Sequence, residues 1–310
     1  MKQNLPDMEQ LKTAPLVSII ALNFNQTAVT CEFLESTKQL TYPHFETIVI
    51  DNGSKVDPTA QIEAGNYPNL KLIISPENLG FTGGNNLGIE HAKGEFVFIV
   101  NNDTEVTPDL LQHLLAPFET DPSIGVVCPK IRFWHHPTVI QYAGFHKMNL
   151  LTGRTWAVGS KEEDNGQHNT SGPTWCAHGA AMMVKREVIE KVGRFAEKFF
   201  IYYEESDWSA RILRAGYKIY YNADGLIFHK ESITMGKESP IKVYYMTRNR
   251  ILYMRRNTSK RQLAAFYLFF GCLTFPKSVL KYTLKGKFDH LGSFLRGTFW
   301  NLKESKYSPV

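Results

Sequence analysis

The sequence predicts an α/β fold in which a mostly parallel sheet is flanked by helices, followed by a basic, amphipathic helical region. Three observations predict this architecture. Short apolar runs alternate with helical patterns in the first half of the chain, a second set of strand and helix patterns follows, and residues 241–310 are strongly basic. Strands that alternate with helices usually form parallel sheets joined by right-handed crossovers.

The first half of the chain supplies four strands and the helices between and after them. The apolar runs at residues 16–22, 46–50, 70–74 and 96–100 have the length and composition of buried strands. Helical patterns occupy residues 27–40, 57–64, 84–92 and 107–120. This order predicts a parallel sheet.

The second half of the chain continues the α/β pattern after a long polar segment. Residues 150–173 are polar and rich in glycine, and because ordinary loops are shorter, we expect a mobile lid beside a substrate site. The remaining strands are predicted at residues 125–133, 179–184, 218–222 and 226–228, and helices at 186–192 and 207–215.

One predicted strand ends in an unusual group of side chains. Residues 95–106 read EFVFIVNNDTEV, in which five apolar residues run directly into Asn101, Asn102 and Asp103. So apolar a run is typical of a strand buried on both faces, and its polar end lies where open α/β sheets bind ligands. The same residue types also favour turns. The stretch therefore predicts either a ligand site or a plain turn.

The first two predicted strands also end in hydrogen-bonding groups. Asn23 and Asn25 follow the first strand and Asp51 follows the second, where they could hold the polar edge of a nucleotide base. A dinucleotide-binding domain needs Gly-x-Gly-x-x-Gly directly after the first strand, and no glycine occurs there. Glycines, Gly84 among them, instead surround a helix start at residues 78–89, where backbone N–H groups could approach a pyrophosphate.

Three positions, an aspartate, an asparagine and a histidine, are candidates for a cation site. Asp103 and Asn101 form a pair of the Asp-x-Asp type with one neutral member. A nucleotide diphosphate binds with Mg²⁺, which takes one or two carboxylates plus phosphate oxygens. His229 follows the apolar run 226–228 and could supply a further ligand, although a single histidine is more often structural.

An acidic cluster marks the second half. Glu204, Glu205 and Asp207 place three carboxylates within four residues, directly after the apolar residues 199–203. Crowding of carboxylates in a cleft raises a pKa toward the range of a general base. The alternative is an acidic helix N-terminus, which the helix dipole favours and which suits Asp207 best.

Charge and composition narrow the class of protein. A hydrophobic content of 43% and a charged content of 21% are typical of a folded soluble protein, and the four cysteines form no Cys-x-x-Cys pair, so we expect reduced thiols. Residues 241–310 contain 14 Lys or Arg against two acidic residues, whereas the rest of the chain contains 21 against 28. This basic region interleaves its charges with aromatic and aliphatic residues, which favours an anionic membrane surface over nucleic acid.

We expect the basic region to lie on a membrane and not to cross it. Its longest apolar run, residues 263–275, stops at Pro276, whereas a spanning helix needs about 20 residues. The alternative is a pair of basic helices packed on their own domain.

Together these motifs resemble glycosyltransferase family 2, particularly its rhamnosyltransferase-like branch. The resemblance extends from about residue 17 to residue 256. In chain order its segments are VSIIALNFN, IVIDNGS, ENLGFTGGNNLGI, FVFIVNNDTEV, GAAMMVKREVIEKVGRFAEKFFIYYEESDWSARI and YYMTRNRILYMRR.

The resemblance implies a GT-A fold, a dTDP- or UDP-sugar donor, Mg²⁺ or Mn²⁺, and inversion at the anomeric carbon. Asp51 matches the family's base-recognising aspartate, and Glu205 matches its catalytic base. The residues expected to bind the donor are Asn23, Asn25, Asp51, Gly84, Asn85, Asn102 and Asp103. The expected metal ligands are Asp103, His229 and Asn101. Residues expected near the acceptor are Trp175, His178, Glu204 and Asp207, with a buried core position as the alternative for Trp175.

Three positions depart from the family pattern. Asn101 replaces the first aspartate of the metal motif, so one carboxylate contact is lost. The base is Glu205, one methylene longer than the usual aspartate, and Asn85 stands where the family often has an arginine. None of these departures removes a required function.

The expected activity is inverting transfer of a sugar, with rhamnose as the branch-level expectation, to a hydroxyl of a glycan or lipid-linked saccharide in cell-surface polysaccharide synthesis. The enzyme is expected in the cytoplasm, peripheral on the inner face of the membrane. Residues 1–15 form a lead-in, 16–240 a catalytic domain with its nucleotide-binding half at 16–106 and its acceptor half at 107–240, and 241–310 the C-terminal region. The alternatives are a non-catalytic sugar-binding or scaffold protein, or a nucleotidyltransferase, which should carry a Gly-rich basic loop after the first strand.

Overall fold

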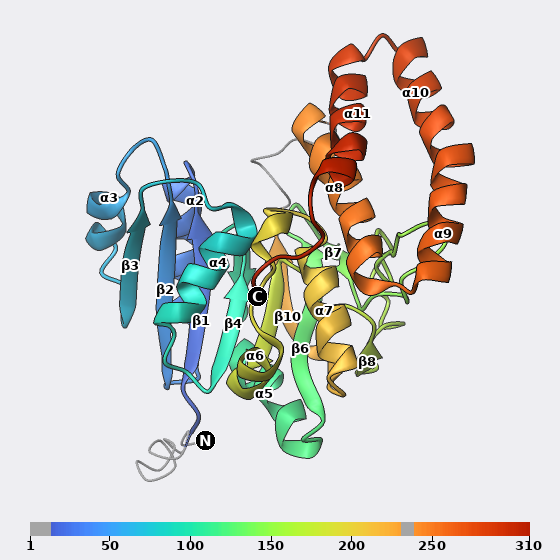
Figure 1. Ribbon diagram of the computed structural model, residues 1–310. Helices are drawn as coiled ribbons and strands as arrows, with labels where there is room; N and C mark the ends of the chain where they lie inside the picture. Colours follow the sequence, from blue (N-terminus) through green and yellow to red (C-terminus); the bar gives the residue numbers. More distant parts are fainter. Residues whose placement is uncertain (1–13, 231–238) are drawn as a thin grey trace, which may run out of the picture.

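The computed structural model describes residues 14–230 and 239–310, so most of the expected lead-in, residues 1–15, lies outside the described residues. One mixed sheet organises these residues (Figure 1). Its first four strands are β1 (Val17–Asn23), β2 (Phe45–Asn52), β3 (Leu70–Ser75) and β4 (Phe96–Val100). The connecting helices are α2 (Thr27–Thr37), α3 (Thr59–Ala64) and α4 (Gly80–His91).

The strands β3, β2, β1 and β4 lie side by side and are all parallel, which confirms the prediction for the first half. Residues such as Ile19, Ile20 and Val49 are fully buried although neighbours along a strand point to opposite faces. Helices therefore cover both faces of this half, as an all-parallel sheet requires.

The second half of the sheet is mixed. Its strands are β5 (Thr104–Val106), β6 (Ile124–Phe133), β7 (His136–Tyr142), β8 (Gly172–Thr174), β9 (Ala181–Lys185) and β10 (Lys218–His229). Strand β9 runs antiparallel between β4 and β6, and β10 runs parallel to β6. The helices of this half are α5 (Leu110–Thr120), α6 (Arg186–Val192), the 3₁₀ turn η1 (Glu197–Phe199) and α7 (Glu204–Arg214).

Several predicted boundaries differ from the structure by three or four residues, such as the start of α4 at Gly80 instead of residue 84, and two differences bear on the site. The strands predicted at 218–222 and 226–228 are one strand, β10, with an irregularity in its pairing between Asn222 and Leu226. The helix predicted at 207–215 begins earlier, at Glu204, so the acidic cluster forms its first turn. The short or polar strands β5, β7 and β8 were not predicted, because their sequences lack an apolar run.

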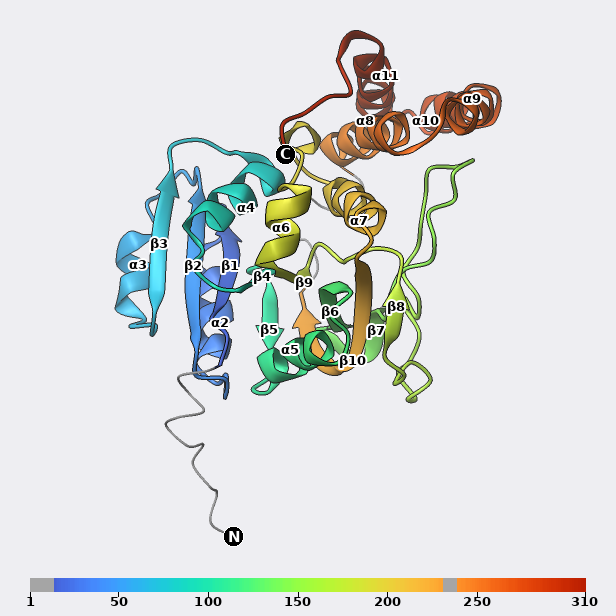
Figure 2. The same cartoon turned by 60° about the horizontal axis from the view of Figure 1, so that its bottom comes forward.

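Helices pack on both faces of the sheet. Helices α2 and α5 lie on one face, and α4, α6 and α7 lie on the other (Figures 1 and 2). The carboxyl ends of β1, β2 and β4 meet at one edge, where the polar residues predicted from the sequence lie.

The segment at residues 150–173 is attached to the sheet over most of its length. The side chains of Asp164 and Lys130 are 2% and 3% exposed, and Lys130 Nζ lies 3.0 Å from Asp164 Oδ2. The backbone N–H of Ile140 donates to Glu162 at 2.8 Å. Breaking a buried ion pair is costly, so this part does not fit a lid that moves as a whole. The first part of the segment, residues 150–157, belongs to a hairpin that begins at residue 145 and projects from the sheet toward the C-terminal helices (Figure 2). Mobility stays a prediction for residues 150–157 alone.

The C-terminal region consists of helices packed on the catalytic loop and helices that stand away from it. Its elements are α8 (Pro240–Asn257), α9 (Lys260–Phe269), the π-helical segment η2 (Phe270–Thr274), α10 (Phe275–Leu284) and α11 (Phe288–Lys303). Helix α8 carries Ile251, Leu252 and Met254 into a second apolar core that includes Phe199 and Tyr203 beside the acidic cluster. The alternative of helices packed on their own domain holds for α8 and α11, whereas α9 to α10 are largely exposed (Figure 2) and contact with a membrane stays a prediction.

The expectation that Pro276 ends the apolar helix is wrong. Helix continues from Lys260 to Leu284 without a break, because Pro276 falls in the first turn of α10 and the π-helical segment η2 precedes it. These 25 residues are long and apolar enough to cross a membrane by length and composition, and only 11% of the most apolar stretch is buried. A single helix of this kind is weak support for crossing.

Candidate active site

The nucleotide-binding end of the sheet is organised around Asp51. Its side chain is buried, and Oδ1 accepts hydrogen bonds from Asn23 Nδ2 at 2.7 Å and Ser54 Oγ at 2.6 Å. The Ser54 N–H donates to Oδ2 at 3.1 Å. Because a carboxylate has about four acceptor sites, roughly one remains for a ligand. Asn25, in the left-handed region with φ of 54°, accepts from the Lys55 N–H at 2.9 Å and shapes the same loop.

Asn102 belongs to the same hydrogen-bond network. Its Nδ2 donates to Thr30 Oγ1 at 2.8 Å, and Thr30 Oγ1 donates to Asn23 Oδ1 at 2.8 Å. The end of β4 is thereby fixed to the end of β1 through helix α2. Asn102 thus supports the site's geometry with its side chain.

The structure corrects the expected roles of Gly84 and Asn85. Gly84 lies within α4, where an added Cβ would be 3.1 Å from Leu22 and 3.2 Å from Asn52 Nδ2. Asn85 is 1% exposed and donates to the Phe81 carbonyl at 2.8 Å. Both residues allow α4 to pack closely on β1 and β2. Gly84 is the fifth residue of α4, so its N–H belongs to the helix ladder, and the Asn85 side chain bonds within the helix, so neither group is directed at a diphosphate.

The predicted metal ligands lie together at the ends of β4 and β10. His229 Nε2 is 3.1 Å from Asp103 Oδ1 and 3.4 Å from Asn101 Nδ2. His229 Nδ1 lies 2.8 Å from Gln141 Oε1, and since that oxygen only accepts, Nδ1 carries a proton. Nε2 then faces the Asp103 carboxylate either as a protonated donor or as a free lone pair. A cation between the two groups satisfies the second arrangement.

These groups fit a divalent cation that is shared with a substrate. Within residues 14–230 and 239–310 no cluster of three or more His, Cys, Asp or Glu side chains could hold a metal alone. Asp103 and His229 supply one oxygen and one nitrogen, and Mg²⁺ or Mn²⁺ commonly completes such a set with phosphate oxygens and water. Gln141 on β7 orients the histidine, as partners of metal-binding histidines do.

The acidic cluster contains two inequivalent carboxyls. Glu204 is buried, and its Oε2 has no hydrogen-bond partner among the described residues. Burial and the neighbouring charge of Glu205 raise the pKa of Glu204 well above its usual value. Burial also raises the pKa of Glu205, whose Oε1 accepts from Ser206 Oγ at 3.2 Å. The pKa of Glu204 is the more strongly raised of the two, so Glu204 favours the protonated form and Glu205 is the better candidate for a base.

The loop before this pair is held in an unusual backbone conformation. Phe200, Tyr202 and Tyr203 have φ values of 65°, 69° and 71°, a region that costs non-glycine residues free energy. Asn249 of α8 donates through Nδ2 to the carbonyls of residues 199, 201 and 202 at 2.7–2.8 Å. Helix α8 thus fixes the loop that positions both glutamates.

A short segment connects the acid pair to the metal ligands. The Ala177 N–H donates to Ser209 Oγ on α7 at 3.0 Å, and the Asn101 N–H donates to the Ala180 carbonyl at 2.9 Å. Between them, His178 stacks on Phe145 with ring centroids 5.7 Å apart. Burial, together with the charge of His229, lowers the pKa of His178 to about 3, so His178 is neutral at physiological pH.

The two remaining residues predicted near the acceptor lie in different environments. Trp175 is 51% exposed, with Lys147 Nζ 4.7 Å from its ring centroid, so the alternative of a buried core position does not hold. Asp207 is 1% exposed and pairs with Arg211 at 3.1 Å and Arg256 at 2.8 Å. Its carboxylate is fully used in joining α7 to α8, which corrects the expectation that Asp207 contacts an acceptor.

Comparison with known proteins assigns the chain to a family. The sequence profile of Glycosyl transferase family 2 matches residues 18–193, more than half of the chain. The chain belongs to glycosyl transferase family 2. It is a glycosyltransferase, and the matched range contains the sheet ends, Asp51 and the residues Asn101 to Asp103.

Relatives within the family are of modest identity. The chain is 25% identical over 274 residues to the low-salt glycan biosynthesis hexosyltransferase Agl10 of Haloferax volcanii, covering 85% of each chain. It is 24% identical over 247 residues to the N-acetylglucosaminyl-diphospho-decaprenol L-rhamnosyltransferase of Mycobacterium tuberculosis, covering 72% of this chain and 78% of that one. It also matches an uncharacterized protein y4gI of Sinorhizobium fredii at 27% identity over 266 residues, covering 82% of this chain but only 29% of that longer protein.

Solved structures confirm the GT-A glycosyltransferase fold. The mannosyltransferase PcManGT from Pyrobaculum calidifontis, in complex with GDP-Man and Mn²⁺, superposes with a TM-score of 0.59 at 17% identity, covering 93% of this chain and 87% of that chain. At 17% identity this likeness supports the fold alone. The site of this family 2 chain is defined by its own residues.

Sequence reasoning missed several residues of the family 2 site. Ser54 and Gln141 were given no role, and strand β7, which carries Gln141, was not predicted. Arg248 and Asn249 lie in the quoted motif YYMTRNRILYMRR, but their contacts with the acidic loop depend on the packing of α8. No sequence pattern predicted the π-helical segment η2.

Proposed function

We propose that this family 2 enzyme transfers a sugar from a nucleotide-diphosphate donor to a hydroxyl group of a lipid-linked saccharide, with inversion and with Glu205 as the general base. The observation that carries the proposal is the pair of inequivalent carboxyls at the start of α7. Glu204 is buried with Oε2 unpartnered among the described residues and has the more strongly raised pKa, whereas Glu205 accepts from Ser206 beside a segment that leads to the predicted metal ligands.

Each group of residues has a distinct task in the proposed reaction. Asp51 and the loop at Asn23 and Asn25 hold the nucleotide base, and Asp103 with His229 holds the divalent ion that neutralises the departing diphosphate. Glu205 removes the proton of the acceptor hydroxyl as that oxygen attacks the anomeric carbon. The hydrogen bonds from Asn249 of α8 to the loop at residues 199–202 hold the base in position, so the acceptor hydroxyl meets it in a fixed geometry.

The choice of acceptor and sugar rests on the relatives. The Mycobacterium tuberculosis relative is named for rhamnose transfer to a saccharide carried on a decaprenyl diphosphate, so we take rhamnose from a dTDP- or UDP-donor and a polyprenyl-linked saccharide as the substrates. Such an acceptor lies at a membrane. We accordingly propose that the enzyme acts in the cytoplasm, peripheral on the inner face of the membrane.

Helix α10 offers a surface for that membrane contact. Leu280 and Leu284 are 59% and 77% exposed, and Lys277, Lys281 and Lys285 follow one another at helical spacing on the exposed helix. Each lysine near an anionic surface contributes up to about 1 kcal/mol, and the exposed leucines add apolar burial. Four arginines of α8 are buried or partly buried in the protein, so the lysines of α10 carry the proposed contact.

Replacing Glu205 tests the proposal. Glu205→Gln keeps the shape of the side chain but removes its basicity, so turnover should fall by about 100-fold or more while donor binding is retained. Glu204→Gln is the matched control, because a glutamine mimics the protonated state that burial favours, and it should keep most of the activity. Near-normal turnover in Glu205→Gln would refute the assignment.

A further inference from the structure

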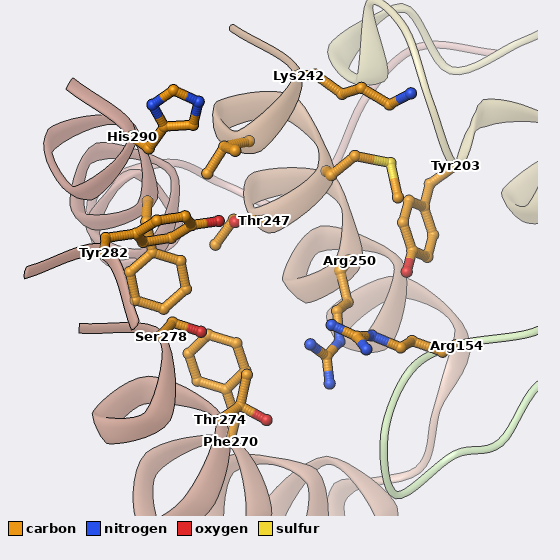
Figure 3. Close-up of a pocket in the computed structure, with 13 residues that line it drawn as sticks. Arg154, Tyr203, Lys242, Thr247, Arg250, Phe270, Thr274, Ser278, Tyr282 and His290 are labelled. Carbon is orange, nitrogen blue, oxygen red and sulfur yellow. The ribbon is translucent and has the colours of Figure 1, made fainter. Parts of the chain in front are cut away.

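Two arginines with no acidic partner lie beside a cavity in the C-terminal region. Arg250 of α8 is 6% exposed, and its Nε donates to the Thr152 carbonyl at 2.5 Å. Its terminal nitrogens have no hydrogen bond or ion pair among residues 14–230 and 239–310, nor does the side chain of Arg154. Figure 3 shows the two guanidinium groups pointing toward each other at the edge of the cavity.

This arrangement is electrostatically unfavourable in the isolated chain. Burial, with the charge of Arg154 as a second cause, lowers the pKa of Arg250 to about 10, and the guanidinium still remains charged at neutral pH. Buried charges in proteins are normally paired. The other buried or partly buried arginines of this helix have partners: Arg256 pairs with Asp207 at 2.8 Å, and Arg248 donates from Nη2 to the carbonyls of Lys198 and Phe199 at 2.8 and 2.6 Å. Only Arg250 is buried, whereas Arg154 is exposed beside it. The unpaired terminal nitrogens of Arg250, with a second guanidinium next to them, therefore fit an anion that enters from outside.

The cavity beside these arginines has a polar end and an apolar continuation. It has a volume of about 220 Å³ and is also lined by Lys242, Phe270 and Phe294. A second cavity of about 1,020 Å³ shares both arginines and continues along Phe269, Leu273 and Pro276 of the exposed apolar helix. An elongated ligand with an anionic group and a hydrocarbon chain matches this shape.

The cavity lies next to the proposed base. Tyr203, which directly precedes the acid pair, lines it, and Tyr203 Oη donates to the Gly153 carbonyl at 2.8 Å. That bond ties the acidic loop to the hairpin that carries Arg154. An anion at the arginines therefore lies beside the loop that leads into Glu204 and Glu205.

From this placement, we propose that Arg154 and Arg250 bind the diphosphate of the lipid-linked acceptor, with its isoprenoid chain along α9 to α10 and its sugar toward Glu205. The inference rests on the proposed function for its acceptor, but the site can be tested by binding alone. The diphosphate is anchored by the two planar guanidinium groups, which suit phosphate oxygens in bidentate geometry.

Binding of geranyl diphosphate to the full chain tests the site, measured by titration calorimetry. The intact chain should bind geranyl diphosphate more tightly than inorganic pyrophosphate, and geraniol should bind weakest. Arg154→Gln and Arg250→Gln should each weaken geranyl diphosphate binding by about 10-fold or more, the effect of losing a charge-assisted contact. Arg261→Gln removes an exposed arginine of α9 and should change nothing.

A stability measurement separates a ligand site from a structural role. Because Arg154 repels Arg250 and has no acidic partner among the described residues, Arg154→Gln should leave the melting temperature of the free chain unchanged or raise it. A large fall would show that the arginine is structural and overturn the inference. Unchanged geranyl diphosphate binding in both arginine variants would overturn it as well.

Two further arms identify the source of the anion. Short-chain phosphatidylglycerol presents a phosphodiester in place of a diphosphate, and it should bind at least 10-fold more weakly than geranyl diphosphate; equal binding would assign the site to membrane phospholipid. Binding of dTDP and UDP should not change in the arginine variants, and a parallel loss would assign the site to the donor. Full turnover in Glu205→Gln would refute the proposed base while leaving this binding result untouched, so the two failures are distinguishable.

Discussion

Replacing Asn249 with alanine should remove the hydrogen bonds that hold Glu204 and Glu205 in position. The Asn249 side chain is fully buried, and its Nδ2 contacts three carbonyls of the loop at residues 199–202. Its Oδ1 accepts from Arg248 Nε at 2.8 Å. Two ordinary hydrogen bonds contribute about 1 kcal/mol each and one from a charged donor about 2 kcal/mol, so Asn249→Ala should lower the free energy of unfolding by about 4 kcal/mol.

The catalytic effect should exceed the effect on stability. Without the amide, the loop is free to leave the positive-φ conformation at Phe200, Tyr202 and Tyr203, because each of these residues costs about 1–3 kcal/mol in the native state. A shift of about 1 Å at a base lowers turnover by about 100-fold. Urea denaturation and steady-state kinetics, measured where the variant is still folded, give the two quantities separately.

Asn301→Ala provides a matched control. Asn301 is also a buried asparagine, and its Nδ2 donates to the Arg248 carbonyl at 2.9 Å and the Gly297 carbonyl at 3.3 Å, away from the acidic loop. The control should lose comparable stability but keep its turnover. If folded Asn249→Ala turns over as fast as the control, the hydrogen bonds from Asn249 do not position the base.

Three further predictions concern the metal, pH and the membrane. Chelation should abolish or sharply reduce transfer, and Asp103→Asn should weaken donor binding mainly when metal is present; full activity in EDTA would contradict the metal site. Burial raises the pKa of Glu204 above its ordinary value near 4.5, so the folded chain binds the proton more tightly than the unfolded chain. The free energy of unfolding should therefore fall as pH rises from that value through the raised pKa. Glu204→Gln should flatten this slope in urea denaturation, and an unchanged slope would contradict the prediction. The full chain should float with anionic but not neutral liposomes, and Lys277→Glu, Lys281→Glu and Lys285→Glu together should abolish flotation; flotation that resists both salt and this charge reversal would indicate a crossing helix.

Local patterns predicted which polar residues gather at the carboxyl edge of the sheet. The four apolar runs with polar ends placed Asn23, Asp51 and Asp103 at one edge of a parallel sheet, and the structure brings them there. The prediction succeeded because a strand's apolar run and the polar residues at its end are neighbours in the chain. Where the sequence carried two patterns at once, as for Asp207, the helix N-terminus proved the better interpretation.

Residues that act through contacts distant in the chain could not be predicted in this way. Gln141 meets His229 only because β7 joins the sheet beside β6. The expected stop at Pro276 failed because the preceding π-helical turn lets the chain continue as helix, a property of backbone geometry that residue type alone does not determine.

The sequence by itself determined the fold class, the family, and which carboxylates and amides lie at the ends of the early strands, since apolar periodicity and chain neighbours decide these properties. Only the tertiary structure decided which member of the acid pair has the more strongly raised pKa, because that depends on burial. It also decided that Arg154 and Arg250 face one cavity without an acidic partner among the described residues. Charges far apart in the chain interact only when packing brings them together and removes the water between them.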